Sequence, residues 1–190
     1  MVADYKPSDR ILKEVAGIYN WLDSQIRRQP ALAGQCKACG ACCDFARFDH
    51  RLFVTTPEIM YLAAHLGTDG LLKMSTGACP YQADGSAGQP RFGSRLRRDE
   101  SLPEHGKCTI YKYRFAGCRV FCCNGDKDFQ SRLSESILRK LKSLCIRCTI
   151  PYRYADLATG LESFCHKASQ SGLNDTYQSA EESCPEGRAD

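Results

Sequence analysis

The chain has 190 residues, of which 43% are hydrophobic and 25% charged, so it is long enough for one domain with a hydrophobic core. Its formal net charge of +4 is small and does not favour a nucleic-acid partner, for which a stronger and more clustered positive charge is expected. No apolar run reaches the roughly 20 residues of a membrane-spanning helix, and the N-terminus lacks the apolar stretch of a secretory signal. We therefore expect a cytoplasmic protein with no membrane partner.

Two segments in the first third of the chain have the apolar periodicity of amphipathic helices. Residues 8–29 repeat apolar side chains at intervals of three and four. Residues 57–66 form the second predicted helix, with Thr56 as its N-cap, Pro57 at the first helical position and Gly67 just past its end.

The second half of the chain predicts more helix and a little strand. A stripe of leucines and isoleucines indicates a helix at 129–144, and the pattern at 154–164 favours a final helix. Residues 51–55 have strand character, and residues 108–111 are expected to form a strand that pairs with 79–82. The expected fold is mostly α with a few short β-strands.

Composition suggests one domain over residues 1–168, followed by a flexible tail at 169–190. Residues 82–107 are rich in Gly, Ser, Arg and Pro and are predicted to form an exposed insertion. Within it, the basic loop 91–98 is either a solvated surface or a site for an anionic partner.

The 13 cysteines are the unusual feature, and Cys36, Cys39, Cys42 and Cys43 crowd into eight residues. In a reducing compartment, clustered cysteines indicate metal ligands before disulfides. Thiolates are soft donors that suit zinc or an iron–sulfur cluster, and two successive Cys-x2-Cys spacings favour the cluster while leaving zinc open. Because neighbouring side chains of an extended chain point to opposite sides, we expect Cys42 and Cys43 to face different environments.

The later cysteines fall into a middle set and a C-terminal set. Cys118 and Cys122 would share a face if the turn between them is helical. A further Cys-x2-Cys pair, Cys145 and Cys148, is followed by Cys165; the alternative for these three is a buried core thiol. The predicted metal ligands are Cys36, Cys39, Cys42, Cys43, Cys79, Cys108, Cys118, Cys122, Cys145, Cys148 and Cys165.

Four stretches in order, "CKACGACC", "TTPEIMYLAAHLG", "CPYQ" and "GKCTIYKYRFAGCRVFCC", resemble the CxxCxxCC (YkgJ-type) cysteine-cluster family of zinc- or iron-chelating domains. The resemblance covers residues 36–123 and leaves 124–168 as a C-terminal helical extension. It implies that the first eight predicted ligands, from Cys36 to Cys122, belong to one pattern. A similar domain occurs in bacterial flagellin lysine N-methylases, where an iron–sulfur cluster is implicated. The sequence departs from the family at Arg114-Phe115, where Arg-Pro is usual.

Arginine and histidine side chains near the cysteines are candidates for binding the cofactor or for replacing a thiol ligand. Arg119 follows Cys118 and is a candidate cofactor-binding residue, because a guanidinium can offset thiolate charge and donate to sulfur; the alternative is a surface arginine. His50 and His105 flank cysteine segments and could replace a thiol, and His166 is an alternative ligand beside Cys165.

Three functions remain open from the sequence. The first is a small metal-centred protein whose cysteines hold a 4Fe-4S cluster or zinc, with a protein or small-molecule partner that the sequence does not identify. The second is an iron–sulfur enzyme that modifies a protein or peptide, for which an open metal position beside Arg119, Tyr111 and Tyr113 would be needed. The third is a zinc-stabilised binding module that uses loop 91–98. No phosphate-binding loop, GxSxG elbow or HExxH motif is present.

Overall fold

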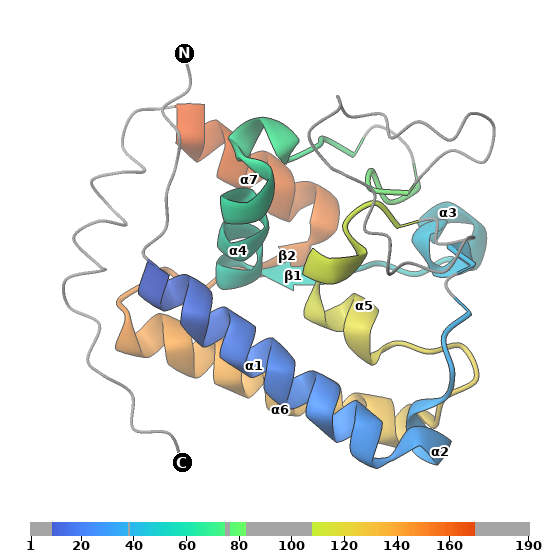
Figure 1. The fold of residues 1–190 in the computed structure, drawn as a ribbon. Helices are drawn as coiled ribbons and strands as arrows, with labels where there is room; N and C mark the ends of the chain where they lie inside the picture. Colours follow the sequence, from blue (N-terminus) through green and yellow to red (C-terminus); the bar gives the residue numbers. More distant parts are fainter. Residues whose placement is uncertain (1–8, 38, 75–76, 83–107, 170–190) are drawn as a thin grey trace.

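The computed structural model describes residues 9–37, 39–74, 77–82 and 108–169. In this part the chain is mostly helical and has one two-stranded antiparallel sheet, as the sequence predicts. Helices α1 (Asp9–Arg28) and α6 (Lys127–Arg147) pack side by side along one side of the molecule. Helices α4 (Thr56–Leu66) and α7 (Leu157–Ser169) pack together on the other side, next to the sheet (Figure 1).

The predictions of helices at 8–29, 57–66 and 129–144 are confirmed to within three residues at each end. Their apolar stripes face one continuous core, because the hydrophobic side chains recur at the helical period. Asp126 starts α6 by accepting a hydrogen bond from the Phe129 N–H at 2.7 Å. The fully enclosed members of this core include Ile11, Val15, Leu22, Met60, Leu62, Ile137, Leu141, Leu144, Leu157 and Leu161.

The N-cap of α4 is Thr55 rather than the predicted Thr56. Thr55 has extended backbone angles, and both its N–H and its hydroxyl donate to Glu58 Oε2, at 2.8 and 2.7 Å. Thr56 is already helical, and its hydroxyl donates instead to the Pro151 carbonyl at 2.9 Å. The helix therefore begins with a capping box in which the carboxylate is buried rather than exposed.

The sheet corrects the prediction of continuous helix at 154–164. Strand β1 (Phe53–Thr55) pairs with β2 (Tyr154–Asp156), with Val54 opposite Ala155, and α7 begins only at Leu157. Asp156 then caps α7 by accepting bonds from the Thr159 N–H and hydroxyl. The partner strand lies about a hundred residues away in sequence, so a local pattern could not reveal the pairing.

Short elements carry the chain between the long helices. The predicted strand at 108–111 is reduced to a single bridge between Cys108 and Gln82, after which the chain turns into a 3-10 helix. These short elements are α2 (Pro30–Ala33), η1 (Ala41–Cys43), α3 (Phe45–Phe48), η2 (Thr68–Gly70), η3 (Tyr111–Tyr113) and α5 (Ala116–Val120).

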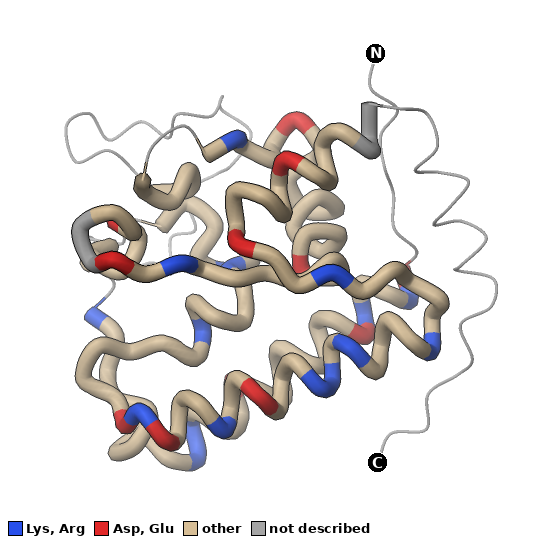
Figure 2. Tube along the Cα trace, turned by 180° about the vertical axis from the view of Figure 1, so that it is seen from behind, with Lys and Arg blue, Asp and Glu red and all other residues tan. Residues whose placement is uncertain are grey.

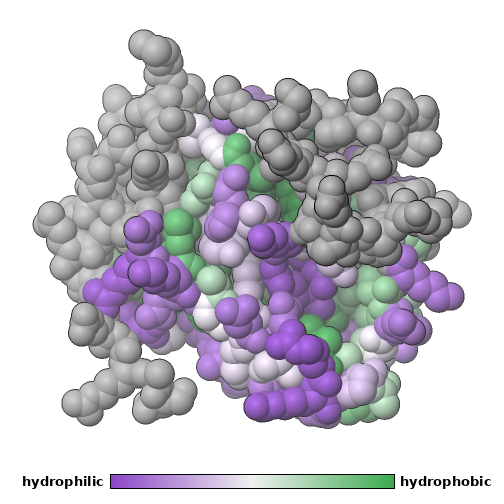
Figure 3. Space-filling view, in the orientation of Figure 1, coloured by the Kyte–Doolittle hydropathy of each residue, from purple (hydrophilic) through white to green (hydrophobic). Residues whose placement is uncertain are grey.

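Charged and hydrophobic residues are interspersed in the described part of the chain. Lysines and arginines alternate with aspartates and glutamates along the chain trace (Figure 2). In Figure 3, hydrophilic residues cover much of the described surface, with smaller hydrophobic areas between them. The basic loop 91–98, nearly all of the predicted insertion at 82–107 and the tail beyond Ser169 lie outside the described residues.

Replacing Gly34 with Ala is expected to lower the free energy of unfolding by about 2 kcal/mol, since a side chain there is strained and crowded. Gly34 has φ +74°, and an added Cβ would lie 2.6 Å from Asn124 Oδ1 and 2.9 Å from the Gly125 nitrogen. Urea unfolding monitored by circular dichroism measures the change.

The matched control is Gly17→Ala in the middle of α1, where an added Cβ meets nothing within 4 Å. This substitution should raise the unfolding free energy by about 0.5–1 kcal/mol, because alanine is the better helix former. Equal effects at the two glycines would contradict the close packing at Gly34.

Candidate metal centre

Backbone hydrogen bonds bring three cysteine-bearing segments together. The Cys79 N–H donates to the Cys43 carbonyl at 2.7 Å, and Asp44 forms a β-bridge with Ala78. Next to this bridge, the Ala46 N–H donates to the Gly77 carbonyl at 2.8 Å. The loop that holds Cys42 and Cys43 is therefore fixed against the segment that holds Cys79.

The third segment joins through Gln82. Its backbone forms a bridge with Cys108, and its side-chain amide donates to the Gly40 carbonyl at 3.2 Å. The N–H and the hydroxyl of Thr109 both donate to the Tyr81 carbonyl at 2.9 Å. One glutamine thus links the first cysteine loop to the segment that begins at Cys108.

The adjacent pair does not diverge as the extended-chain argument predicted. Residues 41–43 form a 3-10 turn, in which neighbouring side chains are not on opposite sides. The Cys42 thiol donates a hydrogen bond to Cys43, and the Cys43 thiol donates to Cys79. Three of the predicted ligands therefore form one chain of contacting thiols.

The pKa values of these thiols reflect the contact. Donation to Cys43, together with burial, raises the pKa of Cys42 far above its usual range. For Cys43, acceptance from Cys42 lowers the pKa, but donation to Cys79 and burial outweigh it and raise the pKa to about 12. In the absence of metal these thiols are protonated at neutral pH.

Cys108 and Cys118 lie close enough to this chain of thiols to sense its charge. Burial first, and then the proximity of Cys108, Cys43 and Cys42, raises the pKa of Cys118. Burial raises the pKa of Cys108, with smaller contributions from Cys42 and Cys36. We call Cys36, Cys42, Cys43, Cys79, Cys108 and Cys118 the thiol cluster.

Arg114 is the cation of the thiol cluster, a role that the sequence analysis gave to Arg119. The positive charge of Arg114 opposes the rise in the pKa of Cys42, Cys108 and Cys118. Its guanidinium stacks over the Tyr111 ring at 4.2 Å from the centroid.

Arg119 instead clamps its own segment to α1. Its guanidinium donates to Asp23 at 2.8 Å and to the carbonyls of Lys112 and Arg114 at 2.7 and 2.9 Å. It also lies over the Tyr19 ring at 4.3 Å, with a side chain only 9% exposed. It is not a surface arginine, and its described bonds go to Asp23 and to two backbone carbonyls, so its role is to hold the chain around Cys118 in place.

Glu58 is the buried polar group that the sequence analysis missed. Besides the two bonds from Thr55, its Oε1 accepts from the Ala116 N–H at 2.7 Å and from the Tyr19 hydroxyl at 3.3 Å. Burial raises its pKa, while these bonds act in the opposite direction. The T-x-x-E spacing was visible in the sequence, but its burial depends on α1 and α5 closing over it.

Two of the family-pattern cysteines lie outside the thiol cluster. Helix α5 ends at Val120, so Cys122 does not share a helical face with Cys118, and its thiol donates to Asn124 Oδ1 at 2.9 Å. Cys39 is exposed on the loop between Cys36 and Cys42.

The C-terminal cysteines lie in different surroundings. Cys145 is buried in the core, and burial alone raises its pKa to about 12. Cys148 is fully buried and disulfide-bonded, which corrects its prediction as a thiolate ligand, because an oxidised sulfur is no thiolate. Cys165 contacts the Leu71 carbonyl at 3.9 Å, away from Cys145.

The histidines do not replace the missing ligands in the described part of the chain. His50 Nε2 lies 3.0 Å from the Cys42 carbonyl oxygen, and its ring packs against Phe45 and Phe121. His50 thus supports the cysteine loop through its backbone. His166 is exposed on α7, and His105 lies outside the described residues.

Within the described residues, no group of three or more His, Cys, Asp or Glu side chains has the geometry of a metal site. The thiols are gathered but do not form a coordination shell. Nor does any described helix have the length and apolar character needed to cross a membrane. Comparison with protein-family models, curated proteins and solved structures found no match to this chain.

Proposed function

We propose that the thiol cluster binds a soft metal centre, either an iron–sulfur cluster or zinc. The observation that carries this proposal is the convergence of thiols from three separate segments, tied together by the backbone bonds around Cys43, Cys79 and Cys108. Such a gathering of thiolate donors suits these metals and poorly suits magnesium or calcium.

The first candidate ligand set is Cys42, Cys43, Cys79 and Cys108, with Cys36 and Cys118 close by. The first three already contact one another through their thiols, and Cys108 is the next thiol whose charge acts on Cys43. A tetrahedral zinc ion needs four such donors, and an iron–sulfur cluster is likewise held by four thiolates. The Arg114 charge would balance part of the negative charge that four thiolates carry.

Metal binding would supply the free energy to draw these side chains together. Burial and thiol–thiol hydrogen bonding raise the pKa of Cys42 and Cys43, so these two ligands keep their protons in the absence of metal, and a bound cation would displace those protons and attract the resulting thiolates. This explains how a cluster that lacks metal-site geometry in the free protein could become a site on binding. It also means that affinity should increase with pH, since each ligand releases a proton.

The proposal is tested by purifying the full chain without oxygen, followed by metal analysis and a visible absorption spectrum. Iron and inorganic sulfide with a broad visible absorption would identify an iron–sulfur cluster. A colourless protein with one zinc per chain would identify zinc. A protein that binds neither metal, even after reconstitution with each, would contradict the proposal.

The enzyme alternative has no support from a described feature. The residues expected to line a pocket beside the metal are already engaged: Arg119 holds Asp23, Tyr111 lies under Arg114, and Tyr113 packs against His65. A cavity among the described residues lies elsewhere, between the sheet and α7.

A further inference from the structure

A cavity of about 80 Å³ lies between the two-stranded sheet, α4 and α7. Its walls are mainly apolar and come from all of these elements: Val54 from β1, Ile59 from α4 and Phe164 from α7. One water needs only about 10–15 Å³, and an apolar cavity of about 150 Å³ accepts benzene, so this volume suits a few carbon atoms.

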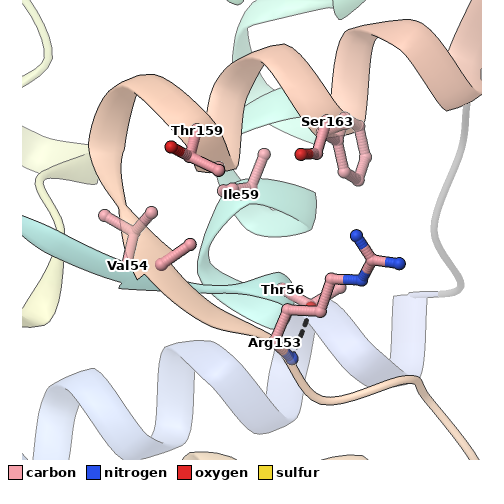
Figure 4. Close-up of a pocket in the computed structure, with 9 residues that line it drawn as sticks. Val54, Thr56, Ile59, Arg153, Thr159 and Ser163 are labelled. Carbon is pink, nitrogen blue, oxygen red and sulfur yellow. Dashed lines mark hydrogen bonds between the residues drawn. The ribbon is translucent and has the colours of Figure 1, made fainter.

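Two polar groups face the cavity without a described partner. Figure 4 shows the Arg153 guanidinium extending from the residue before β2 toward α7, while the Ser163 hydroxyl on α7 points toward Ile59. The Arg153 bonds among the described residues are made by its backbone: its N–H donates to the Thr56 hydroxyl at 3.1 Å, and its carbonyl accepts from the Thr56 N–H at 3.2 Å. By contrast, the Thr159 hydroxyl is already bonded to Asp156.

The cavity also depends on a glycine. An added Cβ at Gly160 would lie 2.9 Å from Val54 Cγ2 and 3.0 Å from Ile59 Cδ1. The absence of a side chain at this position of α7 therefore keeps the helix close to the sheet. The apolar floor and the charged rim are held by rigid elements, which is the usual arrangement of a small-molecule site.

We propose that this cavity binds a small monocarboxylate with a short branched apolar chain. The apolar chain fills the space between Val54, Ile59 and Phe164. The carboxylate accepts hydrogen bonds from the Arg153 guanidinium, whose planar shape matches it, and from the Ser163 hydroxyl. This site is separate from the thiol cluster and does not rest on the metal proposal.

The test is titration of the ¹⁵N-labelled full chain with 3-methylbutanoate, followed by NMR. Amide shifts should change at Val54, Ile59 and Gly160, and the affinity should be weak because the ligand is small. Arg153→Gln should weaken binding by about 10-fold or more, since a charge-assisted bond is lost. Ser163→Leu should abolish binding by filling the cavity.

Two controls make the test specific. Arg139→Gln, an exposed site on α6, changes the net charge equally and should leave binding unchanged. The neutral analogue 3-methylbutan-1-ol should bind at least 10-fold more weakly than the acid. The proposal is overturned if the alcohol binds as well as the acid, if Arg153→Gln binds like the native chain, or if no pocket amide shifts.

Discussion

Replacing Glu58 with Gln is expected to lower the free energy of unfolding by about 3 kcal/mol, although the two side chains have the same shape. Both carboxylate oxygens accept from backbone N–H groups, Oε2 from Thr55 and Oε1 from Ala116. An amide has only one oxygen. Its nitrogen must therefore face one of these N–H groups, which, unlike a hydroxyl, cannot turn to accept. Urea unfolding measures the loss.

Glu135→Gln is the matched control for this prediction. Glu135 is exposed on α6, so its neutralisation should change stability by less than about 0.5 kcal/mol. If Glu58→Gln lowered the unfolding free energy as little as Glu135→Gln, the Glu58 carboxylate would not be what holds α1, α4 and α5 together. Glu58→Gln should also displace Cys118, because the Ala116 N–H that Glu58 binds belongs to the first residue of α5, the helix that carries Cys118.

Replacing Cys43 with Ser is expected to lower metal affinity by more than about 100-fold, since changes outside the ligand shell alone cost about 10–100-fold. Cys43 is the central thiol of the cluster, because it accepts from Cys42 and donates to Cys79. A hydroxyl is a much poorer ligand for soft metals than a thiolate. Competition with a chelator, followed by metal analysis, measures the affinity.

The control for Cys43 is Cys123→Ser. Cys123 is exposed and lies outside the thiol cluster, so its replacement should leave the metal content unchanged. A Cys43→Ser protein that retained its metal at native affinity would refute the candidate ligand set. Parallel loss in both variants would instead indicate binding that is not specific to the cluster.

Local patterns predicted the long helices well because each buries one apolar stripe, as at Ile11, Val15 and Leu22. Local patterns failed to predict the backbone structure where contacts between distant residues or a tight turn determine it. Tyr154–Asp156 is a strand only because β1 is present to pair with it. The divergence of Cys42 and Cys43 assumed an extended chain, and Gly40, with φ +75°, begins a tight turn instead.

The candidate site was predicted in part. The spacing of the cysteines pointed to Cys36, Cys42, Cys43 and Cys118, and the family resemblance added Cys79 and Cys108. The sequence could not distinguish the cluster members from Cys122, Cys145 and Cys148, because the spacing of cysteines does not reveal which of them are buried in the core. The sequence predicted Arg119, rather than Arg114, as the cation near the thiols. Arg119 contacts Asp23 and Tyr19 instead, and both of these residues are brought to it by the packing of α1.

The bridge between Gln82 and Cys108 has a consequence for how this chain tolerates change in length. It holds Gln82 and Cys108 next to each other although 25 residues separate them in the sequence. The entropy of closing a flexible loop grows only with the logarithm of its length, by about 0.6 kcal/mol for each doubling. Related chains could therefore gain or lose residues here while keeping the same arrangement of thiols.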